Sequence, residues 1–312
     1  MSGEATLASV AAEFRRQPSL LESFRKASLW SELVEEEDPV LVGAGDSYAA
    51  SLCASFLSGP RVLALDPFSL TESIAWAKKR PVYILSVSGE TTSNIGLARA
   101  LKGVAGRTIA VTSNTESRLA SATDDVVPLP FRPTAKSPGI ATFTLSLAAL
   151  LRICGHDPRL RFEDAMSGAV DESRRIRIAR GQGVTHFAGN NEAYAASIYG
   201  TAKIYELLGR RAQATMLEEF SHMPLFSLEK SDTVNVIDSA GGIKGSRLHR
   251  LLEKAGYESS LLRLKGDRIE RLYVLVFAMQ LAAIDAAKHA GLKAPYFLGA
   301  KNKLRISDEL IY

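Results

Sequence analysis

A short stretch of the chain occurs twice, and this duplication limits the possible folds more than any other feature. The segment AGDSYAAS (44–51) returns as AGNNEAYAAS (188–197). Each copy follows a short β-prone run, PVLV (39–42) or VTHF (184–187), and leads into a helical pattern. Because strand, glycine-containing turn and helix recur in the same order, we interpret the chain as two related halves.

The remainder of each half alternates short apolar runs with helical patterns. The further predicted strands are VYILSVS (82–88), RTIAVTS (107–113) and DVVPLP (125–130) in the first half, and AQATMLE (212–218), TVNVIDS (233–239) and SSLLRL (259–264) in the second. Strands that alternate with helices indicate parallel sheets with helices on both faces. The predicted fold is therefore α/β, with two tandem domains of this kind.

The domain boundaries are placed where these patterns change. We predict an N-terminal helical arm over 1–36, a first domain over 37–156, a charged helical linker over 157–180, and a second domain with a C-terminal tail over 181–312. Within the second domain, a long helical pattern runs from Asp267 to Ala290.

The composition excludes several classes of function. Basic residues are scattered and the net charge is only +4, so we expect no nucleic-acid partner. No apolar run reaches the ~18 residues of a membrane span, and the N-terminus does not resemble a signal peptide. Cys53 and Cys154 fit no metal-ligand spacing. We therefore expect a cytoplasmic protein with buried thiols, without a metal, a cofactor or a membrane partner.

Small hydroxyl side chains crowd the end of one predicted strand. The stretch ILSVSGETTSN (84–94) holds Ser86, Ser88 and Thr91 around Gly89. Ligands of open parallel sheets bind beyond the carboxyl ends of the strands, and a helix N-terminus favours an anion. Several hydroxyls with free amides would hold a phosphate. The alternative is that Ser88 or Thr91 only caps the following helix.

A strand that ends in S-x-S-G-E-T within a duplicated flavodoxin-like unit resembles the sugar isomerase (SIS) family of phosphosugar-binding domains. The similarity is greatest to the isomerase half of glucosamine-6-phosphate synthase, which has two such domains in tandem. The resemblance implies that Ser86, Ser88 and Thr91 hold the sugar phosphate, with the Val87 amide nearby.

Two further strand ends match positions that line the sugar site in the family. The turn VGAGDSY resembles the family's first-strand turn, which implies that Gly45 and Ser47 approach the sugar. Ser113 and Asn114, at the end of the RTIAVTSN strand, match another position that lines the site.

The resemblance extends to groups that could carry the chemistry. Glu206 follows the second turn, Lys203 lies one helical turn earlier among the expected substrate-binding residues, and His222 occurs in E-F-S-H-M-P. The family has a helix glutamate and then, at the same separation, a histidine in an E-x-x-H-x-P context. Aldose–ketose interconversion moves a proton between C1 and C2 after ring opening. We therefore expect Glu206 to be the isomerising base and His222 the ring-opening acid–base. The alternative is a surface Lys203–Glu206 pair and a capping histidine.

The family also implies an assembly and a role for the tail. Its histidine comes from the other subunit of a dimer, so His222 should act across a homodimer interface. Its tail lysine contacts the sugar near C1 and O1. Lys301, in LGAK, and Lys303, before L-R-I, both match that lysine, and the alternative is two solvated lysines.

The sequence also departs from the synthase. We expect no glutaminase domain and no use of glutamine as ammonia source, because the chain starts MSGEATLAS. The family's E-x-x-V-A-S-T-K-x-F-T loop is replaced by RPTAKSPGIATFT (132–144), which leaves the exact sugar open.

Three functions remain open. The first is an enzyme on amino-sugar phosphates, which converts glucosamine 6-phosphate to fructose 6-phosphate with release of ammonia or interconverts ketose and aldose. The second is a glucose/mannose-6-phosphate isomerase, although such relatives carry S-G-N-T. The third is a non-catalytic regulator that binds sugar phosphates. Retention of Glu206, His222 and a tail lysine argues against the regulator.

Overall fold

The structure is a computed structural model that describes residues 4–33, 35–238 and 243–312. Ser239, predicted as the last residue of a strand, and positions 1–3 and 34 of the predicted arm lie outside the described residues. The chain divides into two compact units. Among the described residues, unit 1 contains 16–159 and 301–312, and unit 2 contains 4–15 and 160–300.

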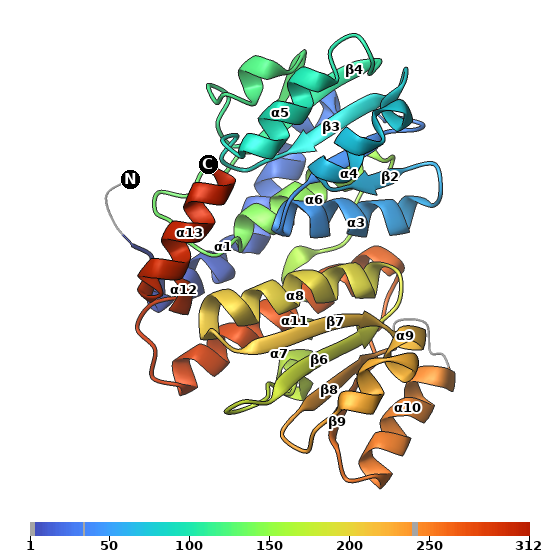
Figure 1. Cartoon of the computed structure of the whole chain (residues 1–312), viewed down its shortest axis with the longest axis vertical. Coiled ribbons are helices and arrows are strands. Elements are labelled where there is room, and N and C mark those ends of the chain that lie inside the picture. The colour runs from blue at the N-terminus through green and yellow to red at the C-terminus, as the bar shows by residue number, and fades with distance from the viewer. Residues whose placement is uncertain (1–3, 34, 239–242) are drawn as a thin grey trace. The chain divides into compact units, whose positions relative to one another are not determined.

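Unit 1 is built on a five-stranded parallel sheet with the strand order β2-β1-β3-β4-β5 (Figure 1). The strands are β1 (Val40–Gly43), β2 (Leu63–Leu65), β3 (Pro81–Leu85), β4 (Arg107–Thr112) and β5 (Asp125–Pro128). The helices are α2 (Ser28–Glu32), α3 (Asp46–Ser58), α4 (Pro67–Glu72), α5 (Thr92–Ala100), α6 (Ala141–Ile153) and α13 (Lys301–Ile311). Helix α1 (Leu7–Lys26) contributes residues to both units.

Unit 2 is built on a four-stranded parallel sheet with the strand order β7-β6-β8-β9. The strands are β6 (Val184–Gly189), β7 (Arg211–Met216), β8 (Thr233–Ile237) and β9 (Glu258–Leu262). The helices are α7 (Phe162–Arg175), α8 (Glu192–Leu208), α9 (Leu217–His222), α10 (Ile243–Lys254), α11 (Arg268–His289) and α12 (Tyr296–Gly299). The predicted α/β class with two parallel sheets is thus confirmed.

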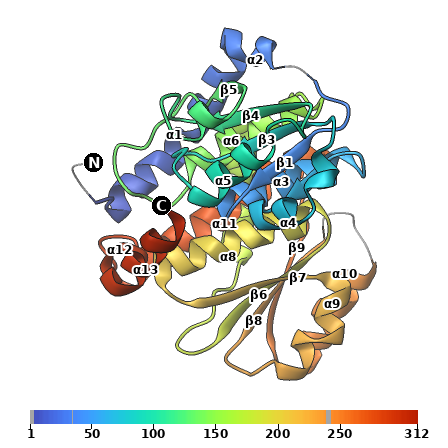
Figure 2. The ribbon, with the colours of Figure 1, turned by 45° about the horizontal axis from the view of Figure 1, so that its top comes forward.

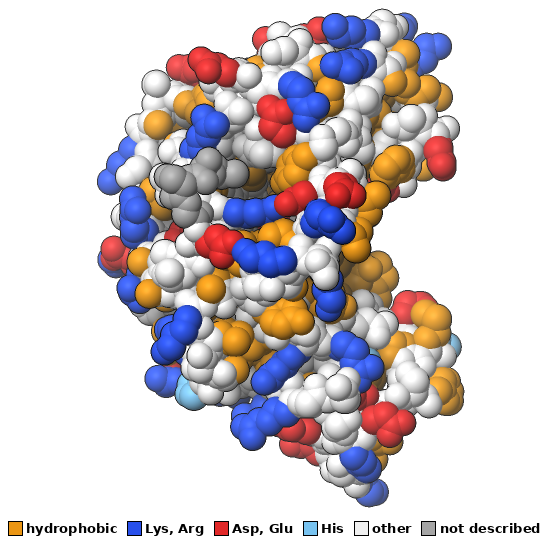
Figure 3. Space-filling view, turned by 60° about the vertical axis from the view of Figure 1, so that its left-hand side comes forward, with side chains coloured by type: hydrophobic (Ala, Val, Ile, Leu, Met, Phe, Trp, Pro, Cys, Tyr) orange, Lys and Arg blue, Asp and Glu red, His pale blue; other side chains and the backbone are white. Residues whose placement is uncertain are grey.

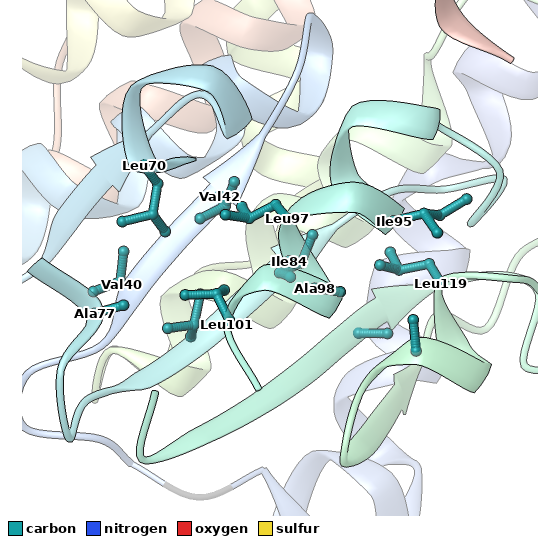
Figure 4. Close-up of a cluster of buried hydrophobic side chains, with 13 residues drawn as sticks. Val40, Val42, Leu70, Ala77, Ile84, Ile95, Leu97, Ala98, Leu101 and Leu119 are labelled. Carbon is teal, nitrogen blue, oxygen red and sulfur yellow. The ribbon is translucent and has the colours of Figure 1, made fainter. Parts of the chain in front are cut away.

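The core of unit 1 lies between the sheet and the helices α4 and α5. Apolar side chains of adjacent strands meet apolar side chains of these helices, as Figure 4 shows for Val40, Val42, Ile84, Leu70, Leu97 and Leu101. Helices α3 and α6 pack together as a further layer. Burial on both faces explains why the strands are continuous apolar runs without alternation of polar residues.

The second unit repeats this plan with its own core. Phe220 of α9 and Leu252 of α10 are buried against Val234 and Val236 of β8. Helices α7 and α8 pack against α11. Asp267 caps α11, because its carboxylate accepts hydrogen bonds from the first N–H groups of that helix.

The two compact units differ in extent from the predicted domains. Residues 301–312, expected to be the tail of the second domain, cluster with unit 1 and form helix α13. Helix α7, expected within a linker, clusters with unit 2. Strand β2 is not among the predicted strands. It has only three residues, and all are partly exposed.

Candidate functional site

The hydroxyl-rich stretch forms a tight loop between β3 and α5. Ser86 is buried, and its Oγ lies 3.2 Å from Thr91 Oγ1 and accepts a 3.2 Å hydrogen bond from the Gly89 N–H. Ser88 is exposed, and its Oγ accepts a 3.2 Å hydrogen bond from the Glu90 N–H. The loop therefore gathers three hydroxyls at the carboxyl end of β3.

The helix cap does not account for these hydroxyls. Thr91 occupies the N-cap position of α5, yet its side chain makes no capping hydrogen bond. Ser88 bonds to Glu90, which precedes the helix. The first N–H groups of a helix lack partners within the helix and carry partial positive charge. Because neither Ser88 nor Thr91 caps these groups, an anion such as phosphate could bind them.

Gly89 is required by the shape of the loop. Its φ of +69° lies in the left-handed region that favours glycine. A Cβ atom at this position would lie 2.0 Å from Ser117 Oγ. The glycine thus lets the loop pack against the segment that follows β4.

Glu90, the glutamate of the S-G-E-T motif, pairs with an arginine of the same unit. Arg118 donates from Nε to Glu90 Oε2 at 2.5 Å and from its backbone N–H to Glu90 Oε1 at 3.2 Å. The hydrogen bond from the Arg118 side chain lowers the pKa of Glu90. Glu90 therefore anchors the loop to the segment after β4. No local sequence pattern predicts this role for Arg118.

The other predicted positions of unit 1 lie at the carboxyl ends of neighbouring strands. Gly45 is the N-cap residue of α3, and Ser47 follows in the first turn of that helix, half-buried. The Ser113 N–H donates to the Val87 carbonyl at 3.1 Å. The strands β1, β3 and β4 are adjacent in a parallel sheet. The turns at their carboxyl ends therefore lie at the same end of the sheet as the hydroxyl loop. Ser113 Oγ, however, donates to the Phe131 carbonyl at 2.8 Å.

The C-terminal helix contacts the start of α5, directly after the hydroxyl loop. Thr92 Oγ1 donates to the Ile311 carbonyl at 3.0 Å, and Lys136 forms an ion pair with Asp308. Figures 1 and 2 both show the C-terminal end of α13 directed toward α5. Lys301 and Lys303 are exposed in the first turn of α13, roughly 12–15 Å along its axis from Ile311. The end of the tail thus touches the start of α5.

In unit 2, Glu206 and Lys203 lie on one face of α8 and pair with each other. Lys203 Nζ donates to Glu206 Oε2 at 2.5 Å. The Lys203 side chain is fully buried, and its ammonium lies 4.8 Å from the ring centroid of Tyr199. The Glu206 side chain is 31% exposed. The carboxylate can therefore reach a ligand, whereas the Lys203 ammonium is held against Glu206 and the tyrosine ring.

His222 is the last residue of α9, and its side chain is 67% exposed. Its Nε2 lies 3.2 Å from Glu218 Oε1, one helical turn earlier. Lys244 also pairs with Glu218. Met223 and Phe226, which follow His222, are exposed, so an apolar surface adjoins this histidine.

Glu206 and the start of α9 lie at opposite ends of α8. The Leu217 N–H donates to Asn190 Oδ1 at 3.1 Å, so α9 begins beside the turn that precedes α8. Glu206 lies fourteen residues along α8 from Glu192, which corresponds to roughly 21 Å. Most of the length of α8 therefore separates Glu206 from the start of α9.

At the strand end that corresponds to Ser86, the described part of unit 2 has a carboxylate instead of a hydroxyl. Asp238 follows β8 where Ser86 follows β3, and this carboxylate is buried. A buried carboxylate at a strand end would repel a phosphate group. The hydroxyl loop of unit 1 is therefore the better phosphate site of the two.

Comparison with known proteins gives relatives of one kind, although no family model matches. The chain is 27% identical over 216 residues to a glutamine–fructose-6-phosphate aminotransferase (isomerizing) of Sulfolobus acidocaldarius, a match that covers 64% of this chain and 36% of that protein. A protein of the same name from Pyrobaculum aerophilum is 27% identical over 253 residues, which cover 72% of this chain and 40% of that protein. The chain thus spans about two fifths of the length of these relatives.

The fold is shared with solved structures along nearly the whole chain. Glucosamine-6-phosphate deaminase from Thermotoga maritima superposes with a TM-score of 0.71 and 20% identity, covering 91% of this chain and 95% of that one. Tagatose-6-phosphate ketose/aldose isomerase from Escherichia coli gives a TM-score of 0.73 with 16% identity, covering 93% and 96%. These matches show a shared fold, the one that the resemblance to the sugar isomerase (SIS) family implied.

Other features of the chain bear on its possible ligands. No three His, Cys, Asp or Glu side chains cluster as metal ligands would in the part of the chain that the structure describes. None of the described helices has both the length and the hydropathy to cross a membrane. On the face shown in Figure 3, Lys and Arg side chains are interspersed with acidic and apolar ones and form no continuous basic patch.

Proposed function

We propose that this chain is a phosphosugar isomerase or deaminase whose hydroxyl loop, Ser86 to Thr91, binds the phosphate of a hexose 6-phosphate. The observation that carries the proposal is the loop itself. Three hydroxyls lie in the loop that precedes α5, and the N-cap side chain of Thr91 makes no capping hydrogen bond to the helix N–H groups. Such a helix start binds phosphate without a metal or a fixed cation.

The substrate we favour is glucosamine 6-phosphate. The reaction consumes water and yields fructose 6-phosphate and ammonia. The S-G-E-T motif supports this choice, as do the names of similar proteins, a glucosamine-6-phosphate deaminase and the isomerizing aminotransferases. The second candidate is a neutral-sugar isomerase, which the tagatose-6-phosphate isomerase supports as a structural neighbour.

Glu206 is the proposed base for the proton at C1 and C2. Its carboxylate is partly exposed, and the adjacent ammonium of Lys203 favours the ionised form that a base requires. Lys203 would therefore act on the substrate through Glu206, by holding the carboxylate in position. A tail lysine, Lys301 or Lys303, would meet O1 of the opened sugar.

His222 is the proposed acid–base for ring opening, contributed by a second copy of the chain. The roughly 21 Å along α8 between Glu206 and the turn beside α9 supports a shared arrangement. The exposed Met223 and Phe226 support an apolar contact next to His222. We place this homodimer in the cytoplasm, where Cys53 and Cys154 remain free thiols.

The test is an assay of the purified protein with glucosamine 6-phosphate that measures fructose 6-phosphate and free ammonia separately. We expect both products in equal amounts. Glucose 6-phosphate, offered in parallel, tests the neutral-sugar alternative. Fructose 6-phosphate from glucose 6-phosphate alone would reject glucosamine 6-phosphate as the substrate.

Two variants separate binding from chemistry. Ser86→Ala should weaken sugar-phosphate binding, measured by calorimetry, by about tenfold because a buried hydroxyl is lost. Glu206→Gln should bind normally and lose at least about a hundredfold of the turnover rate. Glu229→Gln, an exposed glutamate of unit 2, is the matched control and should retain full activity. Binding by a wild type that turns over neither sugar would favour the regulator.

A further inference from the structure

The sheet of unit 2 ends one strand earlier than the sheet of unit 1. In unit 1, the fourth strand β4 pairs with β5, from Ile109 opposite Asp125 to Thr112 opposite Pro128. In unit 2, β9 occupies the place of β4 and is the last strand in the sheet order of the described residues (Figure 1). The outer edge of β9 is therefore an open strand edge.

A hollow of about 900 Å³ surrounds this edge. It is lined by residues of α7, α10, α11 and β9 and of the segment after β9, among them Glu172, Arg175, His249, Ser259, Leu261 and Arg263. Ser260 Oγ donates to Asn235 Oδ1 at 2.9 Å on one face of the sheet. Ser259 Oγ lies 3.0 Å from His249 Nδ1 of α10 on the other. The hollow thus extends around the strand from one face to the other.

The backbone of β9 presents hydrogen-bonding groups to this hollow. The Leu262 carbonyl accepts a 3.0 Å hydrogen bond from the Asp238 N–H, so Leu262 directs its backbone groups toward the β8 side. Backbone groups of successive residues in a strand point in opposite directions. The N–H and C=O of Ser259 and Leu261 are consequently directed to the open edge, where an added strand would pair.

The charge around the edge is predominantly positive. Four cationic side chains, Arg175, Arg177, Arg263 and Lys265, line the hollow with two carboxylates, Asp171 and Glu172. All four cations are exposed. The ion pairs of two of these arginines are long, since Arg175 lies 3.6 Å from Glu172 and Arg177 lies 4.0 Å from Glu258. An occupant with carboxylate side chains would complement this excess of positive charge.

We infer that β9 is a docking edge for an extended acidic segment of a partner protein, which would add a fifth strand to the sheet of unit 2. Backbone hydrogen bonds to Ser259 and Leu261 would supply affinity, and Arg175, Arg263 and Lys265 would select carboxylate side chains. A second copy of β9 does not suit this edge, because it would bring Arg263 and Lys265 against the same cations. The inference is independent of the proposed sugar-phosphate reaction.

The test uses a seven-residue peptide in which valine alternates with glutamate, labelled with fluorescein. Its binding to the full chain is followed by fluorescence anisotropy. We expect saturable binding, and at least about tenfold weaker binding of a peptide in which lysine replaces glutamate. Arg263→Glu combined with Lys265→Glu should weaken binding of the glutamate peptide by a similar factor. Lys254→Glu, on α10 and outside the lining, is the matched control and should leave binding unchanged.

A second variant distinguishes strand addition from simple attraction of anions. Leu261→Pro removes one outward N–H, and an edge strand tolerates proline at such a position. We expect this variant to bind the glutamate peptide at least about fivefold more weakly than the wild type, while its circular dichroism spectrum stays that of the wild type. A peptide in which proline alternates with glutamate should not bind. Absence of binding to the wild type, equal binding of the proline peptide, or an unchanged affinity in Leu261→Pro would each overturn the inference.

Discussion

Gly45 and Asn191 adopt nearly the same unusual backbone conformation at equivalent places in the two units. Gly45 has φ 58° and ψ −126° at the start of α3, and Asn191 has φ 50° and ψ −126° at the start of α8. Such positive φ values favour glycine, and other residues adopt them with strain. The shared conformation supports a common origin of both turns, and it makes Asn191 a strained residue.

Asn191→Gly should therefore stabilise the protein. We expect the free energy of unfolding to rise by about 0.5–1 kcal/mol, because relief of the backbone strain exceeds the added flexibility of the unfolded chain. Urea unfolding followed by circular dichroism measures this difference. Asn190→Gly is the matched control and should destabilise, since Asn190 Oδ1 accepts from the Leu217 N–H. Equal destabilisation by both variants would show that Asn191 is not strained.

The strands and the hydroxyl loop could be predicted from sequence because their signals are local. The apolar run TVNVI predicted the strand β8, and Gly89 among the hydroxyl residues predicted the turn after β3. Whether Ser88 or Thr91 only caps the following helix could not be decided from sequence. The answer depends on which N–H group donates a hydrogen bond to each hydroxyl. The structure shows that Thr91 does not cap α5.

Contacts between distant residues could not be predicted. Arg118 lies 28 positions from Glu90, and Thr92 lies 219 positions from Ile311. Each contact depends on how the sheet and helices pack, which no local pattern of residues specifies. The same reason explains why residues 301–312 were assigned to the second domain although they cluster with unit 1.

The Glu90–Arg118 pair should make the stability depend on pH. Because the pKa of Glu90 is lowered in the folded protein, the pair stabilises above the unfolded pKa of glutamate and loses this effect as pH falls through the folded value. Both side chains are substantially exposed, so Arg118→Ala should cost only about 0.5 kcal/mol at pH 7. Urea unfolding of the wild type and the variant should give converging stabilities below about pH 4. Arg99→Ala, in the last turn of α5, is the control and should show no such convergence. A difference that stays constant down to pH 3 would contradict the pairing.

The contact between Thr92 and the end of α13 should hold the C-terminal helix in place. Thr92→Val removes the hydrogen bond to the Ile311 carbonyl, and Asp308→Asn weakens the ion pair with Lys136. Each lost interaction of about 1 kcal/mol should raise hydrogen exchange of the α13 amides by about fivefold. Arg305→Ala, which breaks an exposed pair with Glu309 within the same helix, should change exchange less than about twofold. Equal effects of all three variants would mean that Thr92 does not anchor the tail.

If each active site takes Glu206 from one chain and His222 from the other, two inactive variants should restore activity when they form mixed dimers. Glu206→Gln removes the proposed base and His222→Ala the proposed ring-opening group, so each variant alone should be inactive. In a random mixture, about half of the dimers contain one chain of each kind, and each such dimer has one of its two sites intact. Co-expression should therefore recover about a quarter of the wild-type activity, measured as fructose 6-phosphate formed from glucosamine 6-phosphate. Co-expression of Glu206→Gln with Glu206→Ala is the control and should stay inactive. Mixed dimers that are verified by mass and remain inactive would place Glu206 and His222 in one chain's site, in spite of the roughly 21 Å of α8 between Glu206 and the turn beside α9.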